Sequence, residues 1–120
     1  THCISSAASD VYKRQVLLAN PGISGALYAW RVIKGRWPEF EQAMLANKTA
    51  ENAGMAAVSY ASNVLKGRWR EMEPTITHKP YDAANYVVSV IKRRVPELEP
   101  KIAQNEWAKK LYEKHFKIEL

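Results

Sequence analysis

Three short basic stretches in this chain carry the residue types that bind phosphate groups. They read KGRW, KGRWR and KRR, and their members are Lys34, Arg36, Trp37, Lys66, Arg68, Trp69, Arg70, Lys92, Arg93 and Arg94. Basic side chains that follow phosphates, together with aromatic rings on which bases stack, are the means by which proteins hold single-stranded nucleic acid. These ten residues are therefore our candidate binding site.

A packing role for the same residues competes with nucleic-acid binding. Two glutamates follow each basic stretch, at Glu39/Glu41, Glu71/Glu73 and Glu97/Glu99. They could pair with the basic residues and cancel much of the positive field. The tryptophans could equally act as wedges between helices, with arginine stems packed on the indoles.

Residues that could carry out catalysis or bind a metal do not converge in the sequence. Glutamates two residues apart do not share a helix face, so the pairs favour helix capping over acid–base work. His78 and His115 lie in different segments of the sequence, whereas a metal site needs three or four converging ligands. We find no nucleophile elbow and no glycine-rich phosphate loop. We predict no catalytic residue, no metal, no cofactor and no enzymatic activity.

The basic stretches belong to an internal repeat. The copies read YAWRVIKGRWPEFE from Tyr28, YASNVLKGRWREMEPTI from Tyr60 and YVVSVIKRRVPELEPKI from Tyr86, and a divergent fourth copy places Tyr112 at the tyrosine position. The tyrosines lie 32, 26 and 26 residues apart. Such self-similarity is typical of arrays in which each unit is one supersecondary element.

Each unit is predicted to consist of two helices. In the second copy Ala57, Tyr60, Val64 and Leu65 share one helix face, and in the third Ala83, Tyr86, Val90 and Ile91 do so, which indicates a buried stripe. A small residue three positions before each tyrosine (Gly25, Ala57, Ala83) suggests a close neighbouring helix.

The ends of these predicted helices are also marked in the sequence. We expect Gly35 and Gly67 to end the long helices in the left-handed conformation. Proline at the first helical position then starts a short second helix. Pro80 and Asn105 mark the starts of the next long helices.

The predicted fold is all-α, with helical-hairpin repeats stacked as a short α-solenoid or helical array. A two-helix unit of this size cannot bury its apolar face alone, so stacking of neighbours must do it. We expect residues 16–120 to form this domain, with about three full units and partial ends, truncated at the N-terminus. The basic amphipathic C-terminal segment WAKKLYEKHFKIEL is predicted to cap the array, with binding to a membrane surface or partner helix as the alternative.

Residues 1–15 differ in composition from the rest of the chain. A back-translation of Ser5–Gln15 resembles the DNA adaptor that a transposase inserts during sequencing-library preparation. We therefore expect residues 1–15 to be a non-native, disordered leader, with a natural disordered tail as the alternative. Because Cys3 is the only cysteine, the remaining chain would then have no disulfide and no thiol chemistry.

Composition limits the class of protein without naming a partner. The net charge of +6 falls to +5 when Asp10, Lys13 and Arg14 are set aside, which permits an anionic partner without requiring one. No stretch approaches eighteen apolar residues, so no membrane span is predicted.

The repeat consensus, roughly YAxxVIKGRWPExEPxI, resembles degenerate helical repeats in uncharacterised bacteriophage and metagenomic proteins. The matching cores are VIKGRWPE from Val32, VLKGRWRE from Val64 and VIKRRVPE from Val90. The resemblance implies an architecture and a viral source, with the cytoplasm of an infected bacterial host as the expected location. Our first functional hypothesis is a scaffold that binds a protein partner, and our second is a nucleic-acid-binding module that uses the ten basic and tryptophan residues.

Overall fold

The computed structural model describes residues 6–120, and the secondary structure it contains there is helical throughout. The α-helices are α1 (Ser6–Ala19), α2 (Ile23–Tyr28), α3 (Pro38–Ala46), α4 (Ala53–Tyr60), α5 (Glu73–Ile76), α6 (Pro80–Tyr86), α7 (Glu99–Ile102) and α8 (Glu106–Phe116). Five-residue π-helical segments extend three of them, η1 (Ala29–Ile33), η2 (Ala61–Leu65) and η4 (Val87–Ile91). Two 3₁₀ turns, η3 (Arg70–Met72) and η5 (Pro96–Leu98), precede α5 and α7. The all-α prediction is confirmed.

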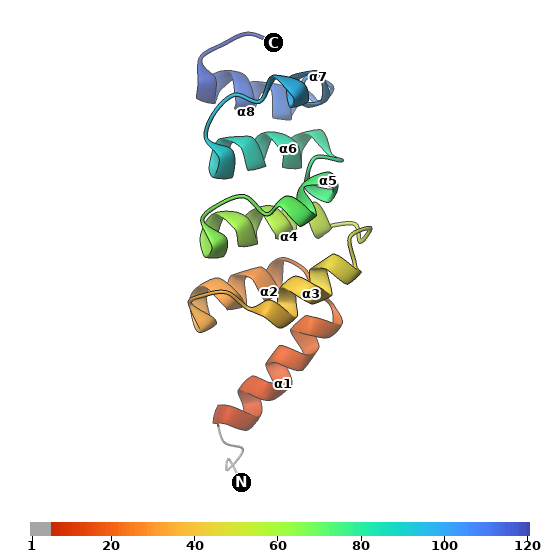
Figure 1. The fold of residues 1–120 in the computed structure, drawn as a ribbon, viewed down its shortest axis with the longest axis vertical. Coiled ribbons are helices and arrows are strands. Elements are labelled where there is room, and N and C mark those ends of the chain that lie inside the picture. The colour runs from red at the N-terminus through yellow and green to blue at the C-terminus, as the bar shows by residue number, and fades with distance from the viewer. Residues whose placement is uncertain (1–5) are drawn as a thin grey trace.

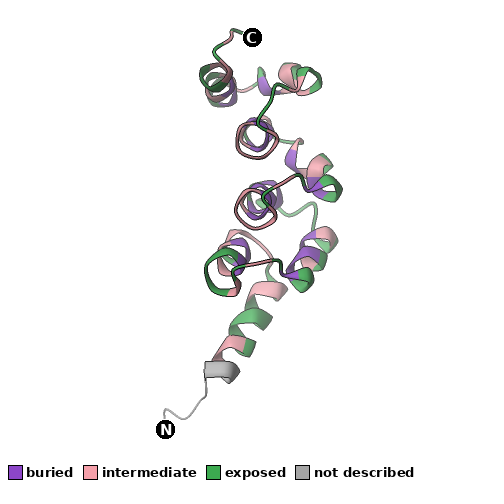
Figure 2. Cartoon of the chain, turned by 60° about the vertical axis from the view of Figure 1, so that its left-hand side comes forward, coloured by how far each residue is buried: buried purple, intermediate pink, exposed green. Residues whose placement is uncertain are grey.

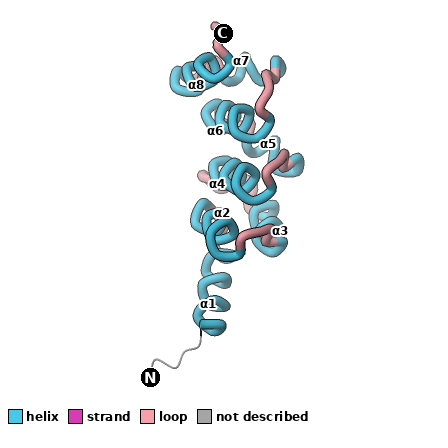
Figure 3. Tube along the Cα trace, turned by 90° about the vertical axis from the view of Figure 1, so that its left-hand side faces the viewer, coloured by secondary structure: helices cyan, strands magenta, loops and turns pink. Residues whose placement is uncertain are grey.

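The helices form two columns along the long axis of the molecule. Helices α2, α4, α6 and α8 lie one above another, and α3, α5 and α7 lie beside them on one side (Figures 1 and 3). The molecule is elongated, with extents of 61 × 24 × 22 Å. Buried residues face the space between the columns (Figure 2).

The stripe predicted from the sequence is buried only in part: its tyrosines and alanines lie in the core, whereas Val64, Leu65, Val90 and Ile91 are half-buried. Tyr60, Tyr86 and Tyr112 are fully buried, as are the small residues Ala57 and Ala83. A Cβ added to Gly25 would collide with the ring of Phe40, which explains the small residue there.

Each short second helix buries an apolar side chain at one equivalent position, and α3 buries Phe40 as well. We call the segment that joins a long helix to the following short helix a corner (residues 34–41, 66–73 and 92–99). Met44, Ile76 and Ile102 are at most 1% exposed, and each lies three residues after the last glutamate of its corner. Burial of such a side chain stabilises the fold by about 1.5–3 kcal/mol. The predicted helix starts are confirmed: Pro80 begins α6, and the Asn105 side chain caps α8 by accepting a hydrogen bond from the Ala108 amide at 2.9 Å.

The prediction that Gly35 and Gly67 end the long helices in the left-handed conformation is wrong. The left-handed residues are the lysines just before them, with φ of 61° at Lys34 and 53° at Lys66, and no glycine has positive φ in the described residues. The π-helical last turn is wider by one residue, so the Lys34 amide donates to the Ala29 carbonyl at 2.7 Å. The left-handed residue therefore lies one position before the glycine at which we expected it.

This correction explains why the third corner keeps its shape although Arg93 replaces the glycine. Lys92 has φ of 62° and donates to the Val87 carbonyl at 2.7 Å, as the first two lysines do at their corners. The position after the lysine needs no special backbone conformation, so arginine is accepted there.

The N-terminal leader also differs from its prediction. We expected residues 1–15 to be disordered, but residues 6–15 are helical and continue into Val16–Ala19 within α1. Ala, Lys, Arg and Gln favour helix, and the stretch contains no Gly or Pro to stop it. Residues 1–5 lie outside the described part of the chain, and the adaptor origin of the leader stays a prediction.

Substitutions at Gly67 and Lys66 test which of the two residues requires the left-handed conformation. We expect Gly67→Ala to leave the melting temperature unchanged or slightly raised, because nothing lies closer than 3.9 Å to the added Cβ and alanine restricts the unfolded chain. Lys66→Gly should stabilise the chain by up to about 1 kcal/mol by relieving the left-handed strain. Thermal unfolding followed by circular dichroism measures both. A clear loss for Gly67→Ala would restore the original glycine assignment.

Candidate functional site

Each corner contains a two-pronged ion pair between an arginine and a glutamate five residues later. Arg36 donates from Nε and Nη2 to the Glu41 carboxylate at 3.0 and 2.7 Å. The same pair of hydrogen bonds joins Arg68 to Glu73 at 2.8 and 2.9 Å, and Arg94 to Glu99 at 2.9 and 3.0 Å. The planar guanidinium matches a carboxylate in this way and fixes its orientation.

A tyrosine from the next long helix completes each corner. Tyr60 donates its hydroxyl hydrogen to Glu41 Oε2 at 2.5 Å and accepts a hydrogen bond from the Trp37 amide at 2.7 Å. In the second corner Tyr86 donates to Glu73 at 2.7 Å and accepts from the Trp69 amide at 2.9 Å.

The third corner repeats this arrangement. Tyr112 donates to Glu99 at 2.6 Å and accepts from the Val95 amide at 3.1 Å. We call the arginine, glutamate, tyrosine and amide of one corner the corner network. Each network joins one unit to the following long helix.

Electrostatics in the corner networks follow from burial and hydrogen bonding. Burial alone would raise the pKa of Glu41, but the hydrogen bonds from Arg36 and Tyr60 outweigh it and hold that pKa below its usual value. The hydrogen bond from Arg68 lowers the pKa of Glu73 against the opposing effect of burial. Burial, followed by the hydrogen bond to Glu73, raises the pKa of Tyr86 to about 12. The carboxylates are therefore ionised and the tyrosines neutral at physiological pH.

The two corner tryptophans are buried. Trp37 is 3% exposed and stacks on Phe40 with ring centroids 5.6 Å apart, and Trp69 is 4% exposed and packs on Tyr60 at 5.1 Å. Their rings fill the space between neighbouring helices, so they present no face on which a base could stack. This placement favours the packing interpretation of both residues.

The remaining predicted site residues lie on the surface, where the network arginines are also exposed. Lys34, Lys66, Lys92, Arg70 and Arg93 are all exposed. Lys34 and Lys66, together with Trp30 and Asn63, line a surface groove of about 370 Å³ between two successive corners. The structure thus separates the ten residues into arginines bound to glutamates, buried tryptophans, and exposed cations.

The glutamate pairs do not act as pairs. Glu41, Glu73 and Glu99 are the glutamates of the corner networks. Glu39, Glu71 and Glu97 are exposed. His78 and His115 are exposed in separate segments. Over residues 6–120, three or more His, Cys, Asp or Glu side chains nowhere gather as a metal site would require.

Sequence reasoning recognised that the glutamates could pair with the basic residues but missed the tyrosines. The available signal was the spacing: Tyr86 follows Glu73, and Tyr112 follows Glu99, by 13 residues. A buried tyrosine whose hydroxyl needs partners, at a constant distance from an acid, indicates such a contact.

No protein-family model, curated protein or solved structure matches this chain. None of the described helices is both long and apolar enough to cross a membrane.

Removing one network hydroxyl tests whether the networks join the units. We expect Tyr86→Phe to lower the free energy of unfolding by about 1–3 kcal/mol, because the Trp69 amide loses its acceptor and Glu73 loses a donor. Urea denaturation measures this loss. The matched control is Tyr81→Phe on the same helix, whose side chain is exposed and whose change should stay within about 0.5 kcal/mol. Equal effects of the two substitutions would contradict the network assignment.

The ionised glutamates predict a loss of stability in acid. Because the pKa of Glu73 in the folded state lies below its usual value of about 4.5, its contribution is complete above that pH and declines as the pH falls toward the folded value. Melting temperatures between pH 7 and 3 should therefore fall less steeply for Glu73→Gln than for the unchanged chain. Glu71→Gln, at an exposed neighbour outside the network, should keep the original slope. Parallel slopes for all three proteins would refute the prediction.

Proposed function

We propose that this chain is a non-enzymatic helical-repeat protein, a short α-solenoid that binds a protein partner along one edge. The resemblance of its consensus to bacteriophage repeats makes a phage origin part of the proposal. The observation that carries it is a column of exposed apolar side chains at one repeated position. We call Met55, Tyr81 and Trp107 the outer column.

The outer column follows from the register of the helices. Each member lies five residues before a buried tyrosine, in α4, α6 and α8 respectively. Five residues along a helix correspond to a rotation of about 140°, which directs these side chains away from the core. The three long helices also begin on the same side of the molecule (Figure 1). The outer column therefore runs along one edge.

The chemistry of the outer column suits a protein partner. Met55 is 47% exposed, Tyr81 46% and Trp107 73%. Methionine and large aromatic residues are enriched in protein interfaces, where aromatic anchors contribute a large share of the binding energy. Large apolar side chains repeated along one edge of an elongated molecule fit an extended or helical segment lying across the helix starts.

The corner networks support the non-enzymatic part of the proposal. Each network arginine and glutamate is used in pairing, and each network tyrosine both donates and accepts a hydrogen bond. These contacts hold neighbouring helices together, which supports a structural role for the network groups. Their recurrence at three corners is explained by structure alone.

A second candidate function is binding of nucleic acid through the exposed lysines. The observation that favours it is the groove between the first two corners, where Lys34 and Lys66 lie near the half-exposed Trp30. The network arginines and buried tryptophans are not needed for this version of the hypothesis.

Replacement of the outer column tests the proposed function. Met55→Ser, Tyr81→Ser and Trp107→Ser are combined in one variant, and the exposed positions Gln42, Glu71 and Glu97 are changed to serine in the matched control. A photo-crosslinker is placed at Lys110 of each protein, whose ammonium group in the unchanged chain lies 5.8 Å from the centre of the Trp107 ring, and is activated in a bacterial lysate. We expect one discrete cross-linked product with the original and control proteins, and its loss from the outer-column variant. Retention of that product by the outer-column variant would refute the edge as the binding surface.

The same proteins distinguish the second candidate function. Fluorescence anisotropy with a labelled single-stranded oligonucleotide should show no binding under the first proposal. Binding that weakens with salt and is lost when Lys34, Lys66 and Lys92 become alanine would favour the second. Lysines are chosen because alanine at Arg36, Arg68 or Arg94 would also break a corner network.

A further inference from the structure

Tyr28 holds the position in α2 that Tyr60, Tyr86 and Tyr112 hold in their helices, but it lacks their hydrogen bonds. Among the buried side-chain nitrogen and oxygen atoms of the described residues, only the Tyr28 hydroxyl has no partner. A buried hydroxyl without a partner destabilises a fold, and native structures contain few of them. The atom therefore marks an incomplete contact.

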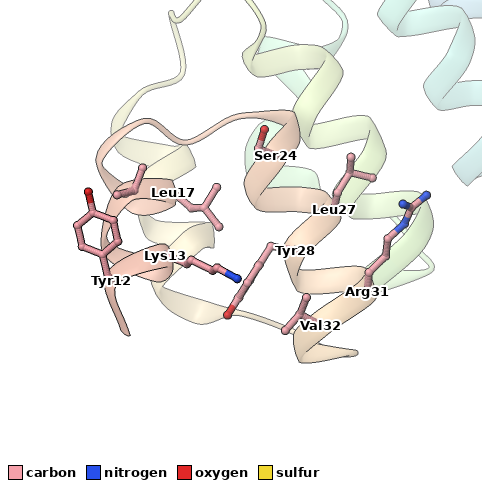
Figure 4. A pocket seen from close by; sticks show the side chains of 9 residues that line it. Tyr12, Lys13, Leu17, Ser24, Leu27, Tyr28, Arg31 and Val32 are labelled. Carbon is pink, nitrogen blue, oxygen red and sulfur yellow. The ribbon is translucent and has the colours of Figure 1, made fainter. Parts of the chain in front are cut away.

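A groove of about 430 Å³ lies beside Tyr28, between α1 and α2. Leu27 and Val32 line it on one side, and Tyr12 and Leu17 line it on the other. Figure 4 shows the Tyr28 side chain extending from α2 into this groove. The equivalent faces of α4, α6 and α8 are each covered by the corner of the preceding unit, through the contacts of their tyrosines.

Helix α1 covers part of this face without supplying a corner. The glutamate that meets Tyr86 or Tyr112 lies 13 residues earlier, and the residue 13 before Tyr28 is Gln15. Its neighbour Arg14 places its guanidinium 5.9 Å from the centre of the Tyr28 ring. Since α1 is one continuous helix from Ser6 to Ala19, it contains no turn that would direct a free amide at the hydroxyl.

We infer that this face of α2 is the docking site for a further helical unit whose corner carries arginine and, five residues later, glutamate. That unit takes the place of α1. Its glutamate accepts the hydrogen bond of the Tyr28 hydroxyl, and the amide four residues before that glutamate donates to it, as at the other three corners. The inference rests on the corner contacts and is independent of the partner proposed for the outer column.

An extended chain tests the inference with the protein's own repeat as the probe. Residues 1–21 are replaced by a second copy of residues 54–79, one full period that ends at the residue before α6. The copied Glu73 then lies 13 residues before Tyr28, the spacing found in the second and third corners. We expect the extended chain to melt at a higher temperature than the original, because an added unit contributes an additional interface.

The decisive measurement is Tyr28→Phe in both chains. In the original chain, this substitution should leave the melting temperature unchanged or raise it, since it removes a hydroxyl without a partner. In the extended chain, it should lower the melting temperature by about as much as Tyr86→Phe does in the original. The matched control is the extended chain in which only the copied Glu73 is replaced by alanine. In that chain, Tyr28→Phe should again leave the melting temperature unchanged.

Three results would overturn the inference. The first is a Tyr28→Phe loss in the original chain as large as that of Tyr86→Phe, which would mean that the hydroxyl already has a partner. The second is an equal effect of Tyr28→Phe in the extended chain and in its Glu→Ala control. The third is an extended chain that melts below the original or fails to fold.

Discussion

The structure depends on a tyrosine hydroxyl that joins two chain segments at once. Beyond the left-handed lysine, the corner leaves an amide inside the molecule without a helical partner, and the tyrosine of the next helix accepts its hydrogen bond. The same hydroxyl donates to a glutamate, whose charge is tolerated there because an arginine binds it with two hydrogen bonds. Removal of any one member leaves a buried donor or a partly buried charge without its partner. The network therefore fixes both the shape of the corner and the position of the following helix.

The differences between the three corners follow from how each residue takes part. Arginine, glutamate and tyrosine act through their side chains, and all three recur in every corner network. The residue after the arginine takes part in the network through its amide, so Val95 can stand there although Trp37 and Trp69 also pack their rings in the other two corners. The position after the lysine requires no left-handed backbone, so Arg93 can replace a glycine. Lysine itself bears the left-handed strain at each corner, and the wide π-helical turn before it places the chain reversal there.

Local patterns in the sequence predicted the helices, their starts at Pro80 and Asn105, and the burial of the tyrosines, because these depend on neighbours within a few turns. They did not predict the bond between a tyrosine and a glutamate 13 residues earlier, which exists only once one helix lies on another. The left-handed residue was misplaced by one position because a π-helical turn adds a residue without any marker such as proline or glycine. The leader was expected to be disordered on the basis of its resemblance to adaptor DNA, yet the helix propensity of its residues depends only on their identity.

Exposed positions are free of the constraints that make the corners alike. The outer column keeps its place in the helix register but changes residue from Met55 to Tyr81 to Trp107, and all three side chains are exposed. A packing role would demand matched shapes at equivalent positions, as it does for the buried tyrosines. A surface that recognises an asymmetric partner needs a different side chain on each helix. The spacing between these side chains is set by the helices that carry them. The corner networks thus set the spacing of the helices, and under our proposal the outer column is where this frame acquires specificity for a single partner.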